Sequence, residues 1–195
     1  MKNQPRTHFI TFLLISFLFT ALIACSSFSG PDPDSVYTRV TDGDLKTGDS
    51  IPEPEGAIIL TISGKIGTTN QDNQIVMDLA TVERVGLVDY TVTDPFNNET
   101  ITFRGVLMRD LLDLWQVDEA ATALETIALN DYFVDVPIAP LREFPVIFAL
   151  QANGEYMEVS DRGPAMLVFP YEEFEFEQPL YDSYWVWQIA KIEAK

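Results

Sequence analysis

The sequence predicts an α+β domain in which a mixed β-sheet is accompanied by few, short helices. Three observations lead to this prediction. The 195-residue chain is 47% hydrophobic, which is enough apolar material for a folded core. Short runs rich in β-branched and aromatic residues recur along residues 57–195, separated by turn signals. Only two stretches of this region have the periodicity of an amphipathic helix, so the expected class is α+β.

The first 24 residues have the pattern of a secretory signal peptide. Lys2 and Arg6 give a positive start, and an apolar stretch over 9–24 follows. This stretch is shorter than the roughly 20 apolar residues that a spanning helix needs. No basic flank follows it to stop transfer across the membrane. We therefore expect residues 1–24 to be removed rather than kept as a membrane anchor.

The signal peptide ends at residues 22–25, Leu-Ile-Ala-Cys, which resemble the lipobox of bacterial lipoproteins. The resemblance implies cleavage before Cys25 and lipidation of its thiol, with ordinary secretory cleavage after Ser26 or Ser27 as the alternative. Several acyl chains, at roughly 0.8 kcal/mol per buried methylene, hold a protein stably on a membrane. We expect export across the inner membrane and lipid anchoring. In a Gram-negative cell, Ser26 implies the periplasmic face of the outer membrane.

Charge and residue counts exclude several classes of function. The chain has 12 Lys plus Arg against 30 Asp plus Glu, a net charge of -18 that becomes -20 when Lys2 and Arg6 leave with the signal peptide. Such a field repels nucleic acid. The only His and Cys are His8 and Cys25, so the mature chain lacks the residues for a Ser-His-Asp triad or a Cys/His metal site. We expect no nucleic-acid partner and no metal site within the monomer.

Residues 25–56 have the composition of a tether. They are rich in Ser, Pro, Gly and Asp, as in Gly-Pro-Asp-Pro-Asp at 30–34 and Ile-Pro-Glu-Pro-Glu at 51–55, and contain few spaced apolar residues. We expect the folded domain to cover residues 57–195.

Eight segments of this domain have the composition of strands. They are 57–62, 88–93, 100–104, 125–129, 132–136, 145–150, 165–169 and 185–193. Asn97-Asn98 and Asn153-Gly154 are turn signals between hairpin arms. Helical periodicity is confined to about 78–86 and 107–116.

Four stretches of the domain resemble, in order, the sulfite-oxidase-like family, also called oxidoreductase molybdopterin-binding domains. They are Phe103-Arg104-Gly105-Val106 with 109–112, 129–132 with Val136-Pro137, 146–154 with 163–164 and 167–170, and 185–188 with Ile192. The resemblance extends over nearly the whole domain from Ile59 onward. It implies a mixed-sheet fold and molybdopterin as the cofactor.

Two residues that the family's catalytic members use are missing from this sequence. Those members place a cysteine thiolate on molybdenum in the segment that corresponds to 90–95, which contains no cysteine. Thr93 or Asp94 would offer a hard oxygen in place of the soft thiolate. The arginine that holds the anionic substrate corresponds to Met166. The resemblance therefore argues against sulfite oxidation.

The candidate ligand-binding residues come from these same stretches. They are Thr93, Arg104, Asn130, Asp131, Tyr132, Arg162 and Gly163. The polar triplet 130–132, between two apolar strands, is typical of a cleft wall or of a tight turn. Arg104, Arg109 and Arg162 are the kind of residue that a cofactor phosphate requires. Arg109 can instead pair with Asp113 along one helix, and Arg162 can close the loop before Gly163.

Trp185 and Trp187 share one face of the predicted last strand, as a wall of the core or as an aromatic platform. Two functions remain open. The first is a noncatalytic module that binds a small ligand or an envelope protein partner. The second is a molybdopterin-dependent oxidoreductase component that uses a non-cysteine ligand or an accessory subunit.

Overall fold

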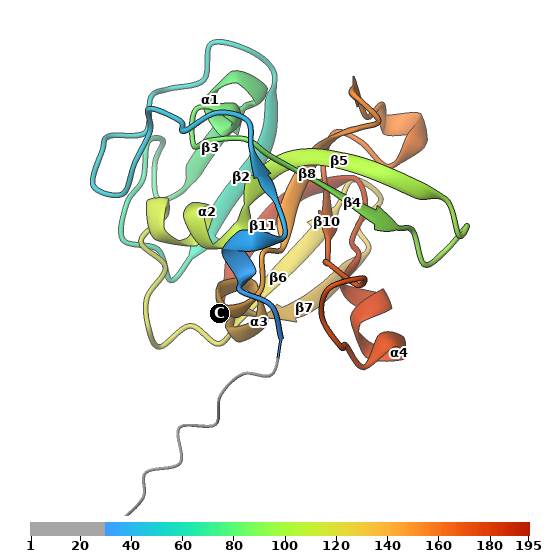
Figure 1. The fold of residues 1–195 in the computed structure, drawn as a ribbon. Helices are drawn as coiled ribbons and strands as arrows, with labels where there is room; N and C mark the ends of the chain where they lie inside the picture. Colours follow the sequence, from blue (N-terminus) through green and yellow to red (C-terminus); the bar gives the residue numbers. More distant parts are fainter. Residues whose placement is uncertain (1–29) are drawn as a thin grey trace, which may run out of the picture.

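The fold is known from a computed structural model that describes residues 30–195 (Figure 1). The predicted signal peptide, residues 1–24, and the predicted lipidation site, Cys25, lie outside the described residues. Two β-sheets and a few short helices make up the described part, so the α+β prediction is confirmed.

The first sheet is antiparallel and has the strand order β1-β4-β5-β8-β10, with β9 paired to β8. Its strands are β1 (Thr38–Arg39), β4 (Val88–Thr93), β5 (Thr100–Leu107), β8 (Ile147–Ala152), β9 (Glu155–Tyr156) and β10 (Met166–Val168). Along β4, residues 88, 90 and 92 are buried and the residues between them face outward. This alternation is the two-residue period that predicted the strand.

The second sheet is mixed and has the strand order β3-β2-β11-β6-β7. Its strands are β2 (Ile58–Gly64), β3 (Ile75–Asp78), β6 (Ala123–Ala128), β7 (Phe133–Pro137) and β11 (Ile189–Ala194). β2 and β11 run parallel, and the other pairs are antiparallel. Both sheets contribute to one continuous hydrophobic core.

Short helices connect the strands. The α-helices are α1 (Leu79–Glu83), α2 (Met108–Leu114), α3 (Ile138–Glu143) and α4 (Gln178–Tyr181), and the 3-10 helices are η1 (Pro33–Ser35), η2 (Val159–Asp161) and η3 (Asp182–Tyr184). The sequence predicted α1 and α2 but neither α3 nor α4. Pro140 obscured α3, yet a proline in the first turn removes no intrahelical hydrogen bond. No helix of residues 30–195 has the length and apolar character needed to cross a bilayer.

The last predicted strand begins later than expected. Residues 185–188 lie outside β11, and Gln188 has a left-handed backbone with φ of 55°. Trp185 and Trp187 therefore do not share the face of a strand. Trp185 is 3% exposed and belongs to the core, whereas Trp187 is 36% exposed.

Part of the predicted tether packs on the domain. β1 pairs with β4, and Leu45 and Ile51 are buried at 2% and 5% exposure. The backbone N–H of Leu45 donates to the carbonyl of Arg84, just after α1. Figure 1 shows this N-terminal segment, in blue, passing α2 before it reaches the loops near α1. The prediction that the folded domain starts at residue 57 is therefore wrong. In the sequence, Leu45 and Ile51 are widely spaced within a segment rich in Ser, Pro, Gly and Asp, so its packing on the domain could not be recognised.

Candidate functional site

A pocket of about 370 Å³ opens where three loops meet. The loops are the β4–β5 turn, the β6–β7 turn, and the segment from η3 to β11. We call this the aromatic pocket; it is lined by Phe96, Ala128, Asn130, Tyr132, Asp182, Ser183, Trp185, Val186, Trp187 and Gln188. Its volume lies in the range typical of small-molecule sites.

Three aromatic rings shape the pocket. Phe96 meets Trp187 edge to face, with ring centroids 5.0 Å apart at 82°, and meets Trp185 at 6.3 Å and 67°. Edge-to-face contacts of this kind are the favoured geometry of aromatic pairs. Phe96 is nevertheless 48% exposed and Trp187 36% exposed. Their apolar surface therefore remains available to a ligand.

A buried ion pair stands behind Trp187. The Arg162 guanidinium lies over the Trp187 ring, 4.5 Å from its centroid, and forms an ion pair with Asp94. The Asp94 side chain is 0% exposed and that of Arg162 is 16% exposed. Asp94 also accepts a hydrogen bond of 2.8 Å from the Phe96 N–H, which fixes the start of the β4–β5 turn. The buried Asp94 carboxylate thus neutralises the charge of Arg162, the only arginine beside the aromatic pocket among residues 30–195.

Gln188 joins the loops around the aromatic pocket. Its N–H donates to the Arg162 carbonyl at 2.9 Å, and its own carbonyl accepts from the Leu129 N–H at 2.9 Å. Its side-chain amide donates to the Val159 carbonyl at 2.6 Å. These contacts hold Trp187 between the Arg162 loop and the β6–β7 turn.

One carboxylate lines the aromatic pocket directly. Asp182 accepts a hydrogen bond of 3.0 Å from the Tyr171 hydroxyl. Burial raises the pKa of Tyr171 far above its ordinary value, and the bond to Asp182 raises it further. Tyr171 therefore stays protonated and serves as a donor to Asp182 at neutral pH. Its ring also packs against Trp185, with centroids 5.4 Å apart.

The predicted triplet is divided between the aromatic pocket and a turn. Asn130 and Tyr132 line the pocket, while Asp131 is exposed at the tip of the β6–β7 turn with φ of 63°. Asn130 Oδ1 accepts from the Tyr132 N–H at 3.1 Å. The turn at Asp131 brings its two neighbours to the pocket wall, and ligand binding by the triplet stays a prediction.

The other candidate residues lie outside the pocket lining. Arg104 forms a bidentate ion pair with Asp89 across β4 and β5, at 2.7 and 2.8 Å, and this pairing raises its pKa. The Thr93 N–H donates to the Glu172 carboxylate. A Cβ at Gly163 would lie 1.9 Å from the Met157 carbonyl oxygen, so no side chain fits at that position. The structure thus separates Arg104 from the triplet and gives Gly163 a packing role.

Sequence reasoning missed Phe96 and Asp182 as pocket residues. A signal for Phe96 was present: it is a large apolar ring within the polar run Asp94-Pro95-Phe96-Asn97-Asn98. An aromatic residue in such a turn usually needs a packing partner, and here the partners are Trp185 and Trp187. No local pattern distinguishes Asp182 from the chain's other acidic residues.

The residues around the aromatic pocket do not fit molybdopterin. Its phosphate needs cationic partners, yet no Lys or Arg lines the pocket among residues 30–195, and Arg162 is already paired with Asp94. The segment that corresponds to the family's thiolate instead presents the Thr93 N–H to Glu172 and the Asp94 carboxylate to Arg162. Asp94 and Arg162 cancel each other's charge, and the exposed Glu172 carboxylate would repel an anionic cofactor. Nor do three or more His, Cys, Asp or Glu residues converge as a metal site in the described part.

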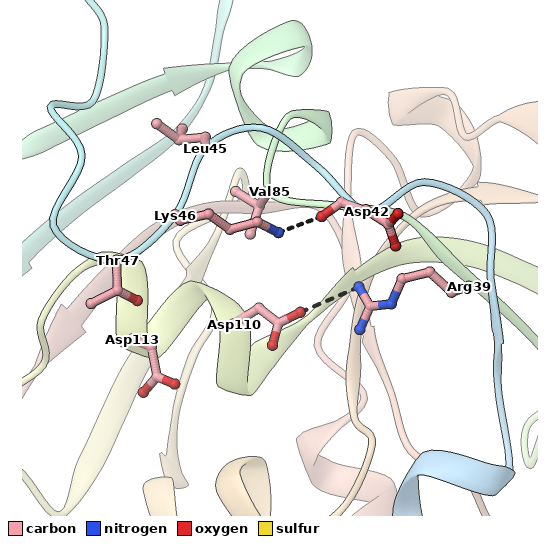
Figure 2. Close-up of a pocket in the computed structure, with 8 residues that line it drawn as sticks. All are labelled: Arg39, Asp42, Leu45, Lys46, Thr47, Val85, Asp110 and Asp113. Carbon is pink, nitrogen blue, oxygen red and sulfur yellow. Dashed lines mark hydrogen bonds and ion pairs between the residues drawn. The ribbon is translucent and has the colours of Figure 1, made fainter.

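A second cavity, of about 340 Å³, lies between the N-terminal segment and α2. Figure 2 shows Arg39 facing Asp110 and Lys46 facing the Asp42 carbonyl across it. The Arg39 and Asp110 groups are 3.6 Å apart. Burial raises the pKa of Asp110, and the nearby Arg39 and Arg109 oppose this rise. These charges pair with one another, so this polar cavity is a weaker ligand candidate than the aromatic pocket.

Comparison with known proteins identifies a fold neighbour among the solved structures. No family model matches the sequence, and no curated protein matches it. Among solved structures, the chain is similar to the sulfane dehydrogenase SoxCD from Paracoccus pantotrophus, with a TM-score of 0.52 and 18% identity. The match covers 69% of this chain and 37% of that chain, so this protein spans well under half of the neighbour's length. The similarity shows a shared fold and agrees with the predicted sulfite-oxidase-like α+β architecture.

Proposed function

We propose that this protein is a lipid-anchored, noncatalytic module of the cell envelope that binds a small organic ligand in the aromatic pocket. One observation carries the proposal: Phe96 and Trp187 keep much of their ring surface exposed around a cavity of ligand size. Exposed apolar rings that gather at one cavity, rather than lying singly on the surface, are typical of a ligand-binding site. Anchoring at Cys25 rests on the lipobox resemblance.

The polar groups of the aromatic pocket suit recognition rather than catalysis. Asn130 uses its oxygen within the turn and has a side-chain NH₂ with no partner in residues 30–195, so this group can donate to a ligand. The Ser183 hydroxyl donates to the Leu180 carbonyl, and the neighbouring Asp182 carboxylate accepts from Tyr171 rather than from Ser183. A few fixed donors and acceptors among apolar rings orient a ligand without activating it.

The experiment is native mass spectrometry of the full chain extracted from its own envelope. We expect a bound organic molecule that Trp187→Ala removes and that Tyr156→Ala retains. Tyr156 is the matched control, because it is a 51% exposed aromatic residue on β9 and does not line the pocket. Equal retention of the molecule by both variants would contradict the proposal.

The alternative function is a molybdopterin-dependent oxidoreductase component, which the fold similarity to SoxCD favours. Measuring molybdenum and pterin per mole of protein, after expression in a host that makes the cofactor, separates the two functions. We expect neither at a stoichiometric level, because the residues of the pocket offer the cofactor no free cation. One molybdenum per chain would establish the alternative.

A further inference from the structure

We infer that the aromatic pocket selects planar ring ligands that are neutral or positively charged and discriminates against anionic ones. This inference rests on the proposed small-ligand function and names the ligand class. It follows from the shape of the pocket and from the distribution of charge around it.

The shape favours a flat ring. Arg162 covers one face of Trp187, and the edge-to-face contact with Phe96 leaves these two partly exposed rings at a large angle to each other. A planar ligand can stack on one ring while its edge meets the other, which are the two favoured aromatic arrangements. The unpartnered NH₂ of Asn130 then supplies a directional hydrogen bond at the pocket wall.

The charge distribution decides the sign of the ligand. The fully buried Asp94 cancels the charge of Arg162, which therefore neither attracts an anion nor repels a cation strongly. Asp182 lines the pocket and has no cationic partner among the described residues. Because the chain as a whole carries a net charge of -18, its long-range field also opposes anions. Exposed faces of Trp and Phe attract cations in addition.

Three probes that share one ring test the inference: tryptamine, indole and indole-3-acetate carry a positive, zero and negative charge. The full chain, in lipid nanodiscs and ¹⁵N-labelled at tryptophan, reports three indole N–H signals, from Trp115, Trp185 and Trp187. Trp115 is 0% exposed and serves as the internal control. We expect tryptamine and indole to shift the Trp187 signal, with indole-3-acetate about tenfold or more weaker than tryptamine at low salt.

Two variants test the cause of the selectivity. Asp94→Asn keeps an oxygen for the Phe96 N–H but releases the charge of Arg162, so indole-3-acetate should bind about tenfold more tightly than to the unmodified chain. Asp182→Asn keeps an acceptor for Tyr171 and does not disturb the buried pair. It should reduce the preference for tryptamine over indole-3-acetate. If the Asp94 variant fails to fold, Asp182→Asn alone tests whether charge causes the selectivity.

The outcomes distinguish the two proposals. Indole-3-acetate binding as tightly as tryptamine, or more tightly, would overturn the inferred ligand class while supporting a ligand-binding pocket. If none of the three probes shifts the Trp187 signal, the inferred ligand class is wrong, and the mass-spectrometric comparison of Trp187→Ala with Tyr156→Ala decides the proposed function separately.

Discussion

The ion pair between Asp94 and Arg162 joins residues that are 68 positions apart and sets the chemistry of the aromatic pocket. An arginine in this loop is an anion-binding candidate by sequence alone. Its buried carboxylate partner changes that role, because the pair satisfies both charges inside the protein. Arg162 instead contacts the Trp187 ring, which belongs to the segment between η3 and β11, and covers one side of it.

Removing Arg162 should destabilise the fold strongly. Arg162→Ala leaves the fully buried Asp94 carboxylate without its counter-ion, and loss of one member of a buried pair costs about 3 kcal/mol or more. Arg142→Ala is the control, because its pair with Asp113 is exposed at 42% and 55% and should contribute about 1 kcal/mol or less. Urea unfolding measures both free energies. Equal losses in the two variants would contradict the burial argument.

Asp78 should make the stability depend on pH in the acid range. Its carboxylate caps α1 at Thr81 N–H and also accepts from the N–H groups of Glu55 and Gly56. Hydrogen bonding from Thr81, more than any other cause, lowers the pKa of Asp78 to about 2. Because the ionised form is favoured in the folded state, this stabilisation is present above about pH 4 and is lost as pH falls through about 2.

Asp78→Asn tests this pH dependence. The variant should be less stable by about 1–2 kcal/mol at pH 7, and the difference should shrink towards pH 2. Thermal unfolding across this pH range measures it. Glu119→Gln, which changes an exposed carboxylate, should leave the pH dependence as it is. A pH-independent difference for Asp78→Asn would show that capping alone, without titration, accounts for the loss.

Among the elements, those with a regular side-chain period were predictable from the sequence. β4 and β5 alternate buried and exposed residues along most of their length, and α2 buries one face, so their patterns reflect the contacts they make. β3 was missed because its apolar run covers only three residues, 75–77, after a polar loop. The aromatic pocket was predicted only in part, since its walls depend on which distant loops meet.

The segment around β1 behaves as an integral element of the domain, which Leu45 can test. Leu45→Ala should lower the free energy of unfolding by about 2–4 kcal/mol, because the side chain is 2% exposed in the core. Val40→Ala, at a position that is 39% exposed in the same segment, should change it by less than about 1 kcal/mol. Chemical denaturation of the full chain compares them. A negligible effect at Leu45 would restore the tether interpretation.

At the scale of the whole molecule, the forces that stabilise the folded domain differ from those that would attach the predicted anchor to a membrane. The domain is held by a core shared between two sheets. Attachment to a membrane is a separate proposal, which rests on the lipobox resemblance at Cys25 and on the stable anchoring that acyl chains give. The net charge of -18 opposes binding of the domain to anionic surfaces.

Cys25→Ala should release the protein from the membrane. The substitution removes the thiol that lipidation requires, so cell fractionation should move the protein from the membrane to the soluble fraction. Ser27→Ala, two residues away, should leave it in the membrane fraction. Persistence of the Cys25→Ala variant in washed membranes would contradict lipid anchoring.

The position of β11 has a consequence for the order of folding. This strand, residues 189–194, lies between β2 and β6, although residues 129–188 of the chain separate it from β6. The β3–β2 pair and the β6–β7 pair therefore cannot join into one sheet until β11 has been synthesised. Pairing of such distant segments is slow because loop closure must precede it. The second sheet of a nascent chain thus stays open until β11 has been made, which is compatible with the export that the predicted signal peptide implies.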